Sequence, residues 1–428
     1  MVTDGAERIP ALGGTRLIPA PDPIAAEYLL LGLRFDQHLP GIVDGYYGPA
    51  DLKARADMEQ RRPPARLLED IAAFSERVEL EISETDRREW LIAQLRALDA
   101  HARALVGEPL DYPAYVERCL GFPPRRHADA VFDAAAAEID ALLPGPGSIP
   151  DRLDAWDRTI EIPTDRLLPI AEWLLERFRG GARERFGLPD GESIRLTTIT
   201  DQPWIAYDRY LGGGRSRVEL NVDLPVTAHD LIVTLGHEAY PGHHLEAAWR
   251  ETDLVERDRR LEVSMILTNT PEGPISEGLA RYGTRFAASL DERPDLLLEI
   301  FDRVGLPIAA DPASARDVAE RTVRLHGLRD RLEAATDEAT LRRYVDGASS
   351  EEVLAYLRDV GRYRSKVAAK RLAFLEDPLS RLYVFAYEGG ESLVAAWVET
   401  AEAPDQVGRF GRLLHEQVTP GRLRAESH

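Results

Sequence analysis

The chain has 428 residues, of which 44% are hydrophobic, and a formal net charge of −21. This hydrophobic content allows a full core and argues against a disordered chain. The acidic balance argues against nucleic acid and against an anionic membrane surface as partners.

The use of cysteine and the lack of long apolar runs indicate the compartment. Cys119 is the one cysteine, so no intramolecular disulfide can form, as is typical of a reducing environment. No run approaches the roughly 20 apolar residues of a membrane span, and the N-terminus lacks the apolar core of a signal peptide. We therefore expect a cytoplasmic protein.

The first part of the chain is predicted to be helical. Residues 1–22 are rich in Gly and Pro and are expected to form a flexible N-terminal arm. Apolar positions then recur at helical spacing, which predicts an N-terminal helical lobe over residues 23–190. The segments that carry this pattern are 24–38, 86–106, 128–143 and 151–185.

The character of the sequence changes after residue 190. Residues 193–200 and 216–222 alternate polar and apolar side chains on either side of Gly212–Gly214, which predicts a small twisted sheet. This sheet either shields one face of a neighbouring helix or offers an edge strand to an extended peptide. The rest of the chain is predicted to be helical, with Asp311-Pro312 and Ser349-x-x-Glu352 as helix starts, so residues 191–428 form the second lobe.

The helix expected after Thr227 carries the most informative motif, HEAYPGHH at residues 237–244. A His-Glu pair followed by His is the metal-binding part of a zinc peptidase, in which the Glu is the general base. In the usual H-E-x-x-H form the two His are four residues apart on one helix face. Here the next histidines, His243 and His244, are six and seven residues after His237.

That spacing requires a break in the helix. On a straight helix these positions lie about 9 and 10.5 Å further along the axis, whereas zinc holds nitrogens at about 2.1 Å. Pro241 has no N–H and its ring clashes with the carbonyl of residue 237, and Gly242 tolerates unusual backbone angles. We therefore expect the helix to break after Glu238 so that His243 or His244 returns to the metal bound by His237.

A third ligand is needed, because catalytic zinc sites usually have three protein ligands and one open position. Glu277 follows a Pro- and Gly-rich turn, and Ser276 before it is a plausible N-cap for a helix. Glu272 and Glu246 are rival candidates. A cofactor of one Zn²⁺ per chain is expected, although Mn or Co also suits such ligands.

Several other residues are candidates for chemical roles. Arg281, one turn after Glu277, is either a clamp for a substrate carboxylate or, more commonly, an ion-paired residue. We expect His229 at a helix start on the surface and His326 in a structural role, and no partner is evident for His38 or His127. Tyr383 and Tyr387, before Gly389-Gly390, are candidates to stabilise an oxyanion.

These motifs resemble the Domain of Unknown Function 885 family of bacterial zinc peptidases of gluzincin type. The family pattern is H-E-x-x-P-G-H-H-L-Q, then E-G-W-A, then Y-x-x-G. The chain departs from it at Glu246, where Gln is common, and at Leu279, where Trp is common. The residues that match the pattern are His237, Glu238, Pro241, Gly242, His243, His244, Leu245, Glu277, Gly278, Ala280, Tyr387 and Gly390.

The resemblance implies a mostly α, two-lobed gluzincin-like peptidase fold with a small β-sheet next to the metal-binding helix. It favours His243 over His244 as the second ligand beside His237 and Glu277. Glu238 is then the general base and Tyr387 the oxyanion residue. The implied function is zinc-dependent hydrolysis of short peptides. A metal-dependent hydrolase of another amide or ester stays open, as does a non-catalytic binding protein, which the intact Glu238 disfavours.

Overall fold

The computed structural model describes residues 20–202 and 204–427. Most of the arm expected over residues 1–22 therefore lies outside the described part. The described chain is mostly helical with a small sheet, which confirms the predicted fold class. None of its helices is long and apolar enough to cross a membrane.

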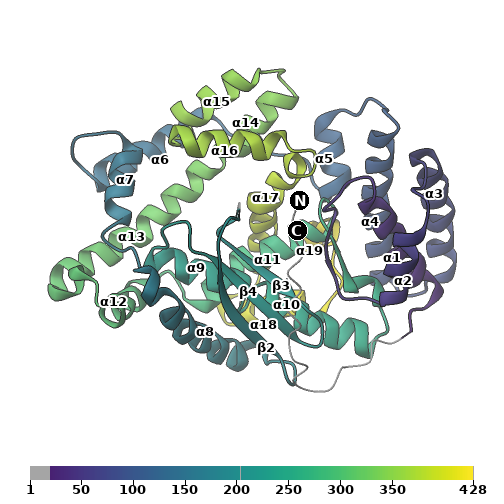
Figure 1. Cartoon of the computed structure of the whole chain (residues 1–428), viewed down its shortest axis with the longest axis horizontal. Coiled ribbons are helices and arrows are strands. Elements are labelled where there is room, and N and C mark those ends of the chain that lie inside the picture. Colours follow the sequence, from purple (N-terminus) through teal and green to yellow (C-terminus); the bar gives the residue numbers. More distant parts are fainter. Residues whose placement is uncertain (1–19, 203, 428) are drawn as a thin grey trace.

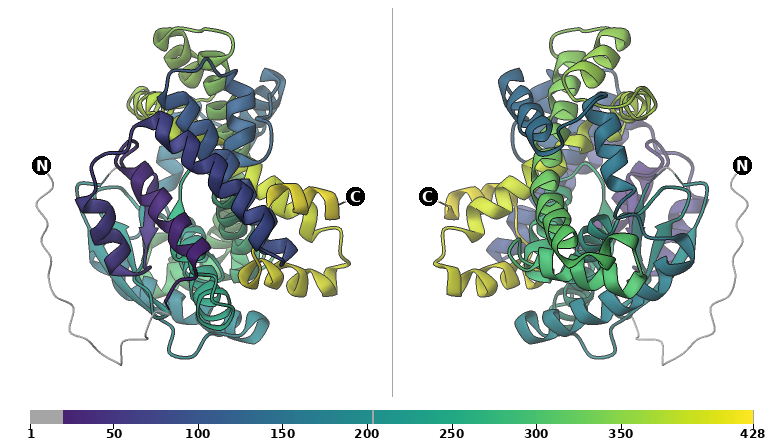
Figure 2. Two further views of the ribbon diagram at one scale, coloured as in Figure 1. Left: turned by 90° about the vertical axis from the view of Figure 1, so that its right-hand side faces the viewer. Right: turned by 90° about the vertical axis from the view of Figure 1, so that its left-hand side faces the viewer.

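The N-terminal helices share a hydrophobic core with a segment from the second half of the chain. Side chains of α1, α3 and α4 pack around Leu254, Val263 and Met265, and β1 pairs antiparallel with β5. In Figure 2 the purple helices at the start of the chain lie on the opposite side of the molecule from its C-terminus. The elements are α1 (Pro23–Asp36), β1 (Val43–Tyr46), α2 (Ala50–Met58), α3 (Pro64–Glu81), α4 (Thr85–Leu105), α5 (Tyr112–Leu120), α6 (Asp129–Leu142), α7 (Ile149–Asp157) and α8 (Thr164–Phe186).

A three-stranded sheet follows, with strand order β2-β4-β3. Strands β2 (Ser193–Ile199) and β4 (Arg215–Asn221) confirm the two predicted strands and run parallel. The sequence did not predict β3 (Ala206–Tyr210), which pairs antiparallel with β4 at the edge of the sheet. Its side chains are mostly half-buried and polar, so an alternating pattern is weak there.

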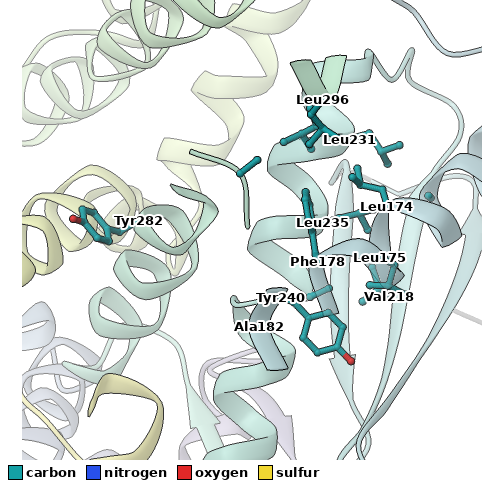
Figure 3. Close-up of a cluster of buried hydrophobic side chains, with 14 of the residues drawn as sticks. Leu174, Leu175, Phe178, Ala182, Val218, Leu231, Leu235, Tyr240, Tyr282 and Leu296 are labelled. Carbon is teal, nitrogen blue, oxygen red and sulfur yellow. The ribbon is translucent and has the colours of Figure 1, made fainter. Parts of the chain in front are cut away.

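Helix α9 (Ala228–Glu238) packs against α8 and against strand β3 of the sheet. Thr227 caps it through a capping box with Asp230. Leu231 and Leu235 on α9 face Leu174 and Phe178 of α8 in a shared core with β4 (Figure 3). Because this packing fixes the helix from two sides, the His-Glu pair at its C-terminal end has a rigid support.

The surface position expected for His229 is wrong. The first turn of α9 packs under α13, and His229 is buried with its ring centroid 4.3 Å from that of His326.

The second half of the chain is helical apart from β5. Asp311 caps α13, and Ser349 forms a capping box with Glu352 on α15, as predicted. Ser276 is not an N-cap, because α11 already begins at Glu272. The elements are α10 (His243–Arg250), the π-helix Glu251–Arg257, the 3₁₀ turn Leu261–Ser264, β5 (Met265–Leu267), α11 (Glu272–Ala287), α12 (Arg293–Val304), the 3₁₀ turn Pro307–Ala310, α13 (Pro312–Glu333), α14 (Ala335–Tyr344), α15 (Ser350–Asp359), α16 (Ser365–Glu376), α17 (Ser380–Val398), the 3₁₀ turn Ala403–Asp405, α18 (Gln406–His415) and α19 (Pro420–Glu426).

Helices α11 and α17 lie against each other near the middle of the molecule (Figure 1). A Cβ atom on Gly278 would lie 2.2 Å from the carbonyl oxygen of Gly390, and one on Gly390 would lie 2.2 Å from that of Pro274. Only glycine permits so close a backbone approach. The glycines of the E-G-L-A and Y-x-x-G motifs therefore bring the two helices together, and with them the side chains of Glu277, Tyr383 and Tyr387.

Candidate metal centre

The predicted break in the helix is present. Helix α9 ends at Glu238, the peptide bond between Tyr240 and Pro241 is cis, and α10 begins at His243. Gly242 has the unusual backbone angles that were expected, with φ −79° and ψ −140°, and it is needed for a second reason as well. A Cβ atom at this position would lie 1.7 Å from the carbonyl oxygen of His237, so the chain folds back against the end of α9 as only glycine allows.

This fold-back brings His243 to His237. Their Nε2 atoms are 3.1 Å apart, and His237 Nε2 is 3.5 Å from Glu277 Oε2. Ligand atoms about 2.1 Å from a tetrahedral zinc ion are separated by about 3.4 Å. The three side chains, whose ligand atoms all lie within 4.8 Å of one another, are thus spaced as zinc ligands would be.

Glu277 supplies a test of whether a metal fits. Its Oε1 accepts a hydrogen bond of 2.6 Å from the Tyr383 hydroxyl, but its buried Oε2 has no hydrogen-bond partner among the described residues. A buried carboxylate oxygen without a partner is costly. Since this oxygen is the one that faces His237, the donor set fits a cation.

The hydrogen bonds of His243 orient its ring toward the same point. Ser276 Oγ lies 3.2 Å from His243 Nδ1 and donates its one proton to Glu246 Oε2 at 2.6 Å. The hydroxyl must therefore accept from Nδ1–H, which leaves the lone pair of Nε2 in the neutral ring free for a metal. Burial opposes a charge on His243, but the nearby carboxylates of Glu246, Glu277 and Glu238 raise its pKa to about 10. The site thus favours a positive charge, which a metal ion would supply in place of the proton.

The rival carboxylates have other partners. Arg250 contacts Glu246 Oε1 at 3.2 Å and Glu272 Oε1 at 2.6 Å. Glu246 therefore orients His243 through Ser276, and Glu272 neutralises the buried Arg250.

His244 points away from the centre. It is fully buried, with Nδ1 2.8 Å from Ser216 Oγ and Nε2 3.0 Å from Glu192 Oε2. Glu192 also accepts from Tyr240 and pairs with Arg179 of α8 at 2.7 Å. Both nitrogens of His244 are used in fixing α10 to the sheet, so the geometry brings His243, and not His244, to His237.

Glu238 lies next to the centre with one oxygen fixed. The backbone N–H of Asp208 in β3 donates to Glu238 Oε2 at 2.9 Å. Burial raises the pKa of Glu238 to about 7, assisted by the charges of Asp208 and Glu277. Burial likewise raises the pKa of Asp208 to about 7. A carboxylate with a pKa near neutrality is suited to both accepting and releasing a proton.

The two tyrosines of α17 differ in their contacts. Tyr383 holds Glu277, while the hydroxyl of Tyr387 has no hydrogen bond to any described residue. Their rings meet edge to face at 5.4 Å. Burial and the charges of Glu277 and Glu238 raise the pKa of Tyr387 well above its ordinary value, so its hydroxyl keeps its proton and can donate it to a substrate oxygen.

Arg281 is ion-paired. Its Nε donates to Glu391 Oε2 on α17 at 2.9 Å. This ion pair is the commoner of the two roles expected for Arg281, and it links α11 to α17.

Sequence reasoning missed several residues of the site, namely Asp208, Glu192, the orienting role of Ser276 and the role of Tyr383 in holding Glu277. Tyr383 had a usable signal, since it precedes Tyr387 by four residues and lies on the same helix face. The others come from the sheet or from a helix interior and depend on packing.

No family model and no curated protein matches the sequence. Among solved structures, a Colwellia psychrerythraea protein described as a lipoprotein has a TM-score of 0.50 at 13% identity, over 84% of this chain. The chain spans only 65% of that protein's length. A Shewanella oneidensis protein described as a lipoprotein of unknown function has a TM-score of 0.45 at 12% identity, over 94% of this chain and 82% of that protein. A structure named BsuCP has a TM-score of 0.44 at 12% identity, over 92% of this chain and 88% of that protein.

An M32 carboxypeptidase from Deinococcus radiodurans R1 has a TM-score of 0.40 at 14% identity, over 94% of both chains. The likeness to the Colwellia protein shows a shared helical fold.

Proposed function

We propose that the chain is a zinc-dependent metallopeptidase that hydrolyses short peptides. The observation that carries the proposal is the convergence of His237 Nε2, His243 Nε2 and the unpartnered Glu277 Oε2, with Glu238 beside them. The resemblance of the motifs to the Domain of Unknown Function 885 family and to gluzincins supports the same function. A cytoplasmic location is part of the proposal.

His237, His243 and Glu277 would hold the ion. When bound, zinc polarises a substrate carbonyl and makes a water molecule acidic enough to attack at neutral pH. Ser276 keeps the His243 ring in the tautomer that presents Nε2, and Tyr383 holds Glu277 through its other oxygen. These contacts fix ligand orientation, on which metal affinity depends strongly.

Glu238 accepts a proton from the attacking water and delivers it to the leaving amine. Its Oε2 is fixed by the Asp208 N–H, so Oε1 is the oxygen available for proton transfer. A pKa of about 7 lets the group exist in both protonation states near neutral pH.

The substrate would lie between β3 and α17. The backbone N–H of Asp208 points outward from the sheet toward Glu238, so the free edge of β3 borders the site. An extended peptide can add to such an edge through backbone hydrogen bonds. From the opposite side, Tyr387 offers its unpaired hydroxyl to the oxyanion that forms at the scissile carbonyl.

The test is cleavage of a library of short peptides, followed by mass spectrometry. The zinc-loaded full-length chain should cleave members of the library, and Glu238→Gln should retain zinc but lose a factor of about 10²–10⁴ or more in rate. Glu299→Gln is the matched control, because this half-buried carboxylate of α12 pairs with Arg303 and lies outside the centre; it should cleave at the wild-type rate. Cleavage of esters or non-peptide amides alone would replace the peptidase assignment, and wild-type rates in Glu238→Gln would contradict the role of this residue.

A further inference from the structure

A second group of metal-ligand side chains lies where α17 meets α14 and the loop before α6. His127 in the loop before α6, Asp337 in the first turn of α14 and Glu388 of α17 place one ligand atom each within 4.8 Å of the others. Three segments that are far apart in the sequence converge here. Helices α6 and α14, which flank two of these residues, belong to one hydrophobic core.

The position of His127 is fixed by its neighbours. Its backbone N–H donates to Glu338 Oε2 at 3.1 Å, and Arg126 holds the other oxygen of Glu338 at 3.0 Å. The ring then lies with Nε2 2.9 Å from Glu388 Oε2. This nitrogen is buried, yet its alignment with the carboxylate does not make a hydrogen bond.

Asp337 provides an independent observation. Asp337 is only 7% exposed, and its carboxylate has no hydrogen bond or ion pair to any described residue. Burial raises the pKa of Asp337 well above its ordinary value, and the charges of Glu388 and Glu333 raise it further. A carboxylate buried in this way needs a compensating positive charge.

The nearby arginines are engaged elsewhere. Arg371 pairs with Glu333 at 2.7 Å, Arg281 with Glu391 at 2.9 Å, and Arg126 with Glu338 and Asp346. No described side chain therefore neutralises Asp337 directly, although the cluster contains a second carboxylate in Glu388.

We propose that His127, Asp337 and Glu388 form a second metal site that binds one divalent cation of the zinc or manganese type. One imidazole and two carboxylates suit zinc and manganese better than calcium or magnesium, which bind oxygen ligands. The two carboxylate charges balance a divalent cation. The side chain of Glu388 is 35% exposed, so the ion has a path from solvent.

A cation here would tie α17 to α14 and to the loop before α6. Glu388 follows Tyr387, and Tyr383 one turn earlier holds Glu277. The second site thus acts as a clamp on the helix that carries these two tyrosines. It does not depend on the proposed peptidase activity.

The test is the zinc and manganese stoichiometry of the full-length chain, first stripped with a chelator and then titrated with each metal alone. His237→Ala removes a ligand of the first centre, so it isolates the second. We expect two equivalents in the wild type, one in His237→Ala, and none when Asp337→Asn or Glu388→Gln is added to His237→Ala. Bound metal should also raise the melting temperature of His237→Ala, and this shift should disappear in both double variants.

Asp346→Asn is the matched control, because Asp346 is an exposed carboxylate on Arg126 outside the cluster. Added to His237→Ala, it should keep one equivalent. His237→Ala protein that binds no metal, or double variants that bind as much metal as His237→Ala, would overturn the second site and leave His127–Glu388 as a simple ion pair. Two equivalents retained in His237→Ala would instead contradict the first centre, and the double variants would still decide the second.

Discussion

Replacing Gly242 by alanine should disrupt the metal centre through the backbone. The added Cβ would lie 1.7 Å from the carbonyl oxygen of His237 and 2.7 Å from that of Gly236. A carbon and a carbonyl oxygen rarely approach closer than about 3.3 Å, so the start of α10 must move away from the end of α9 by about 1.6 Å. Neither neighbour is a flexible side-chain tip that could give way.

The size of this movement decides the effect on metal binding. His237 Nε2 and His243 Nε2 are 3.1 Å apart. A shift of about 1.6 Å along the same direction would separate them to about 4.7 Å, beyond the roughly 3.4 Å of a zinc-bound pair. We expect zinc affinity to fall at least about 100-fold, and the metal-stripped protein to lose about 1–3 kcal/mol of stability, as for other overpacked sites.

The assay combines competitive zinc titration with chemical denaturation of the metal-stripped chain. Gly327→Ala is the matched control, because a Cβ at this helical position meets no atom within 4 Å. It should keep zinc affinity and gain about 0.5–1 kcal/mol. Wild-type zinc affinity in Gly242→Ala would refute the argument that the close approach at Gly242 holds the two histidines together.

Three further predictions follow from the contacts around the centre. His243→Ala should lose zinc from the first centre, whereas His244→Ala should keep it and lose stability, and the reverse result in a zinc titration would exchange their roles. Tyr383→Phe removes the hydrogen bond to Glu277 and should weaken zinc binding about 10–100-fold, with unchanged binding counting against a positioning role. Burial opposes ionisation of Glu192, but hydrogen bonds from His244, Tyr240 and Arg179 lower its pKa to about 2. Its stabilisation should therefore be complete above the ordinary value of 4.5 and be lost as the pH falls toward 2, by about 3 kcal/mol in total. Glu192→Gln should flatten this part of the profile of unfolding free energy against pH, and an unchanged profile would contradict the assignment.

The parts of the structure that follow from local chemistry could be predicted from the sequence. Pro241 cannot continue a helix, so the break after α9 was visible, and so were the caps at Asp311 and Ser349. The alternating strands β2 and β4 were also visible. The mostly helical fold class could be predicted because many separate segments show helical periodicity, and an error in one of them would not change the class.

The parts that depend on tertiary packing could not be predicted. The edge strand β3 lacks a strong pattern because one of its edges borders the centre and not another strand. His229 follows a helix cap, which is usually exposed, but α13 covers it. The separate roles of Tyr383 and Tyr387 depend on the close contact of α11 with α17 at Gly278 and Gly390. The sequence motif contains these glycines but does not show that their helices touch.

The role of Gly242 shows the same distinction. The sequence predicts unusual backbone angles at Gly242, and its φ of −79° with ψ of −140° lies outside the helical and extended regions. The structure adds a second reason, because the side of Gly242 that faces the His237 carbonyl has no space for a Cβ. A sequence shows that a glycine is present, whereas the neighbour that requires it appears only in the folded chain.

The most direct test of the account is an anomalous-difference map of crystals of the zinc-loaded chain, measured on either side of the zinc absorption edge. The account predicts a strong peak within about 2.0–2.2 Å of His237 Nε2, His243 Nε2 and a Glu277 oxygen, with His244 still bonded to Glu192 and Ser216. A peak coordinated by His244, or no peak between His237 and Glu277, would contradict it.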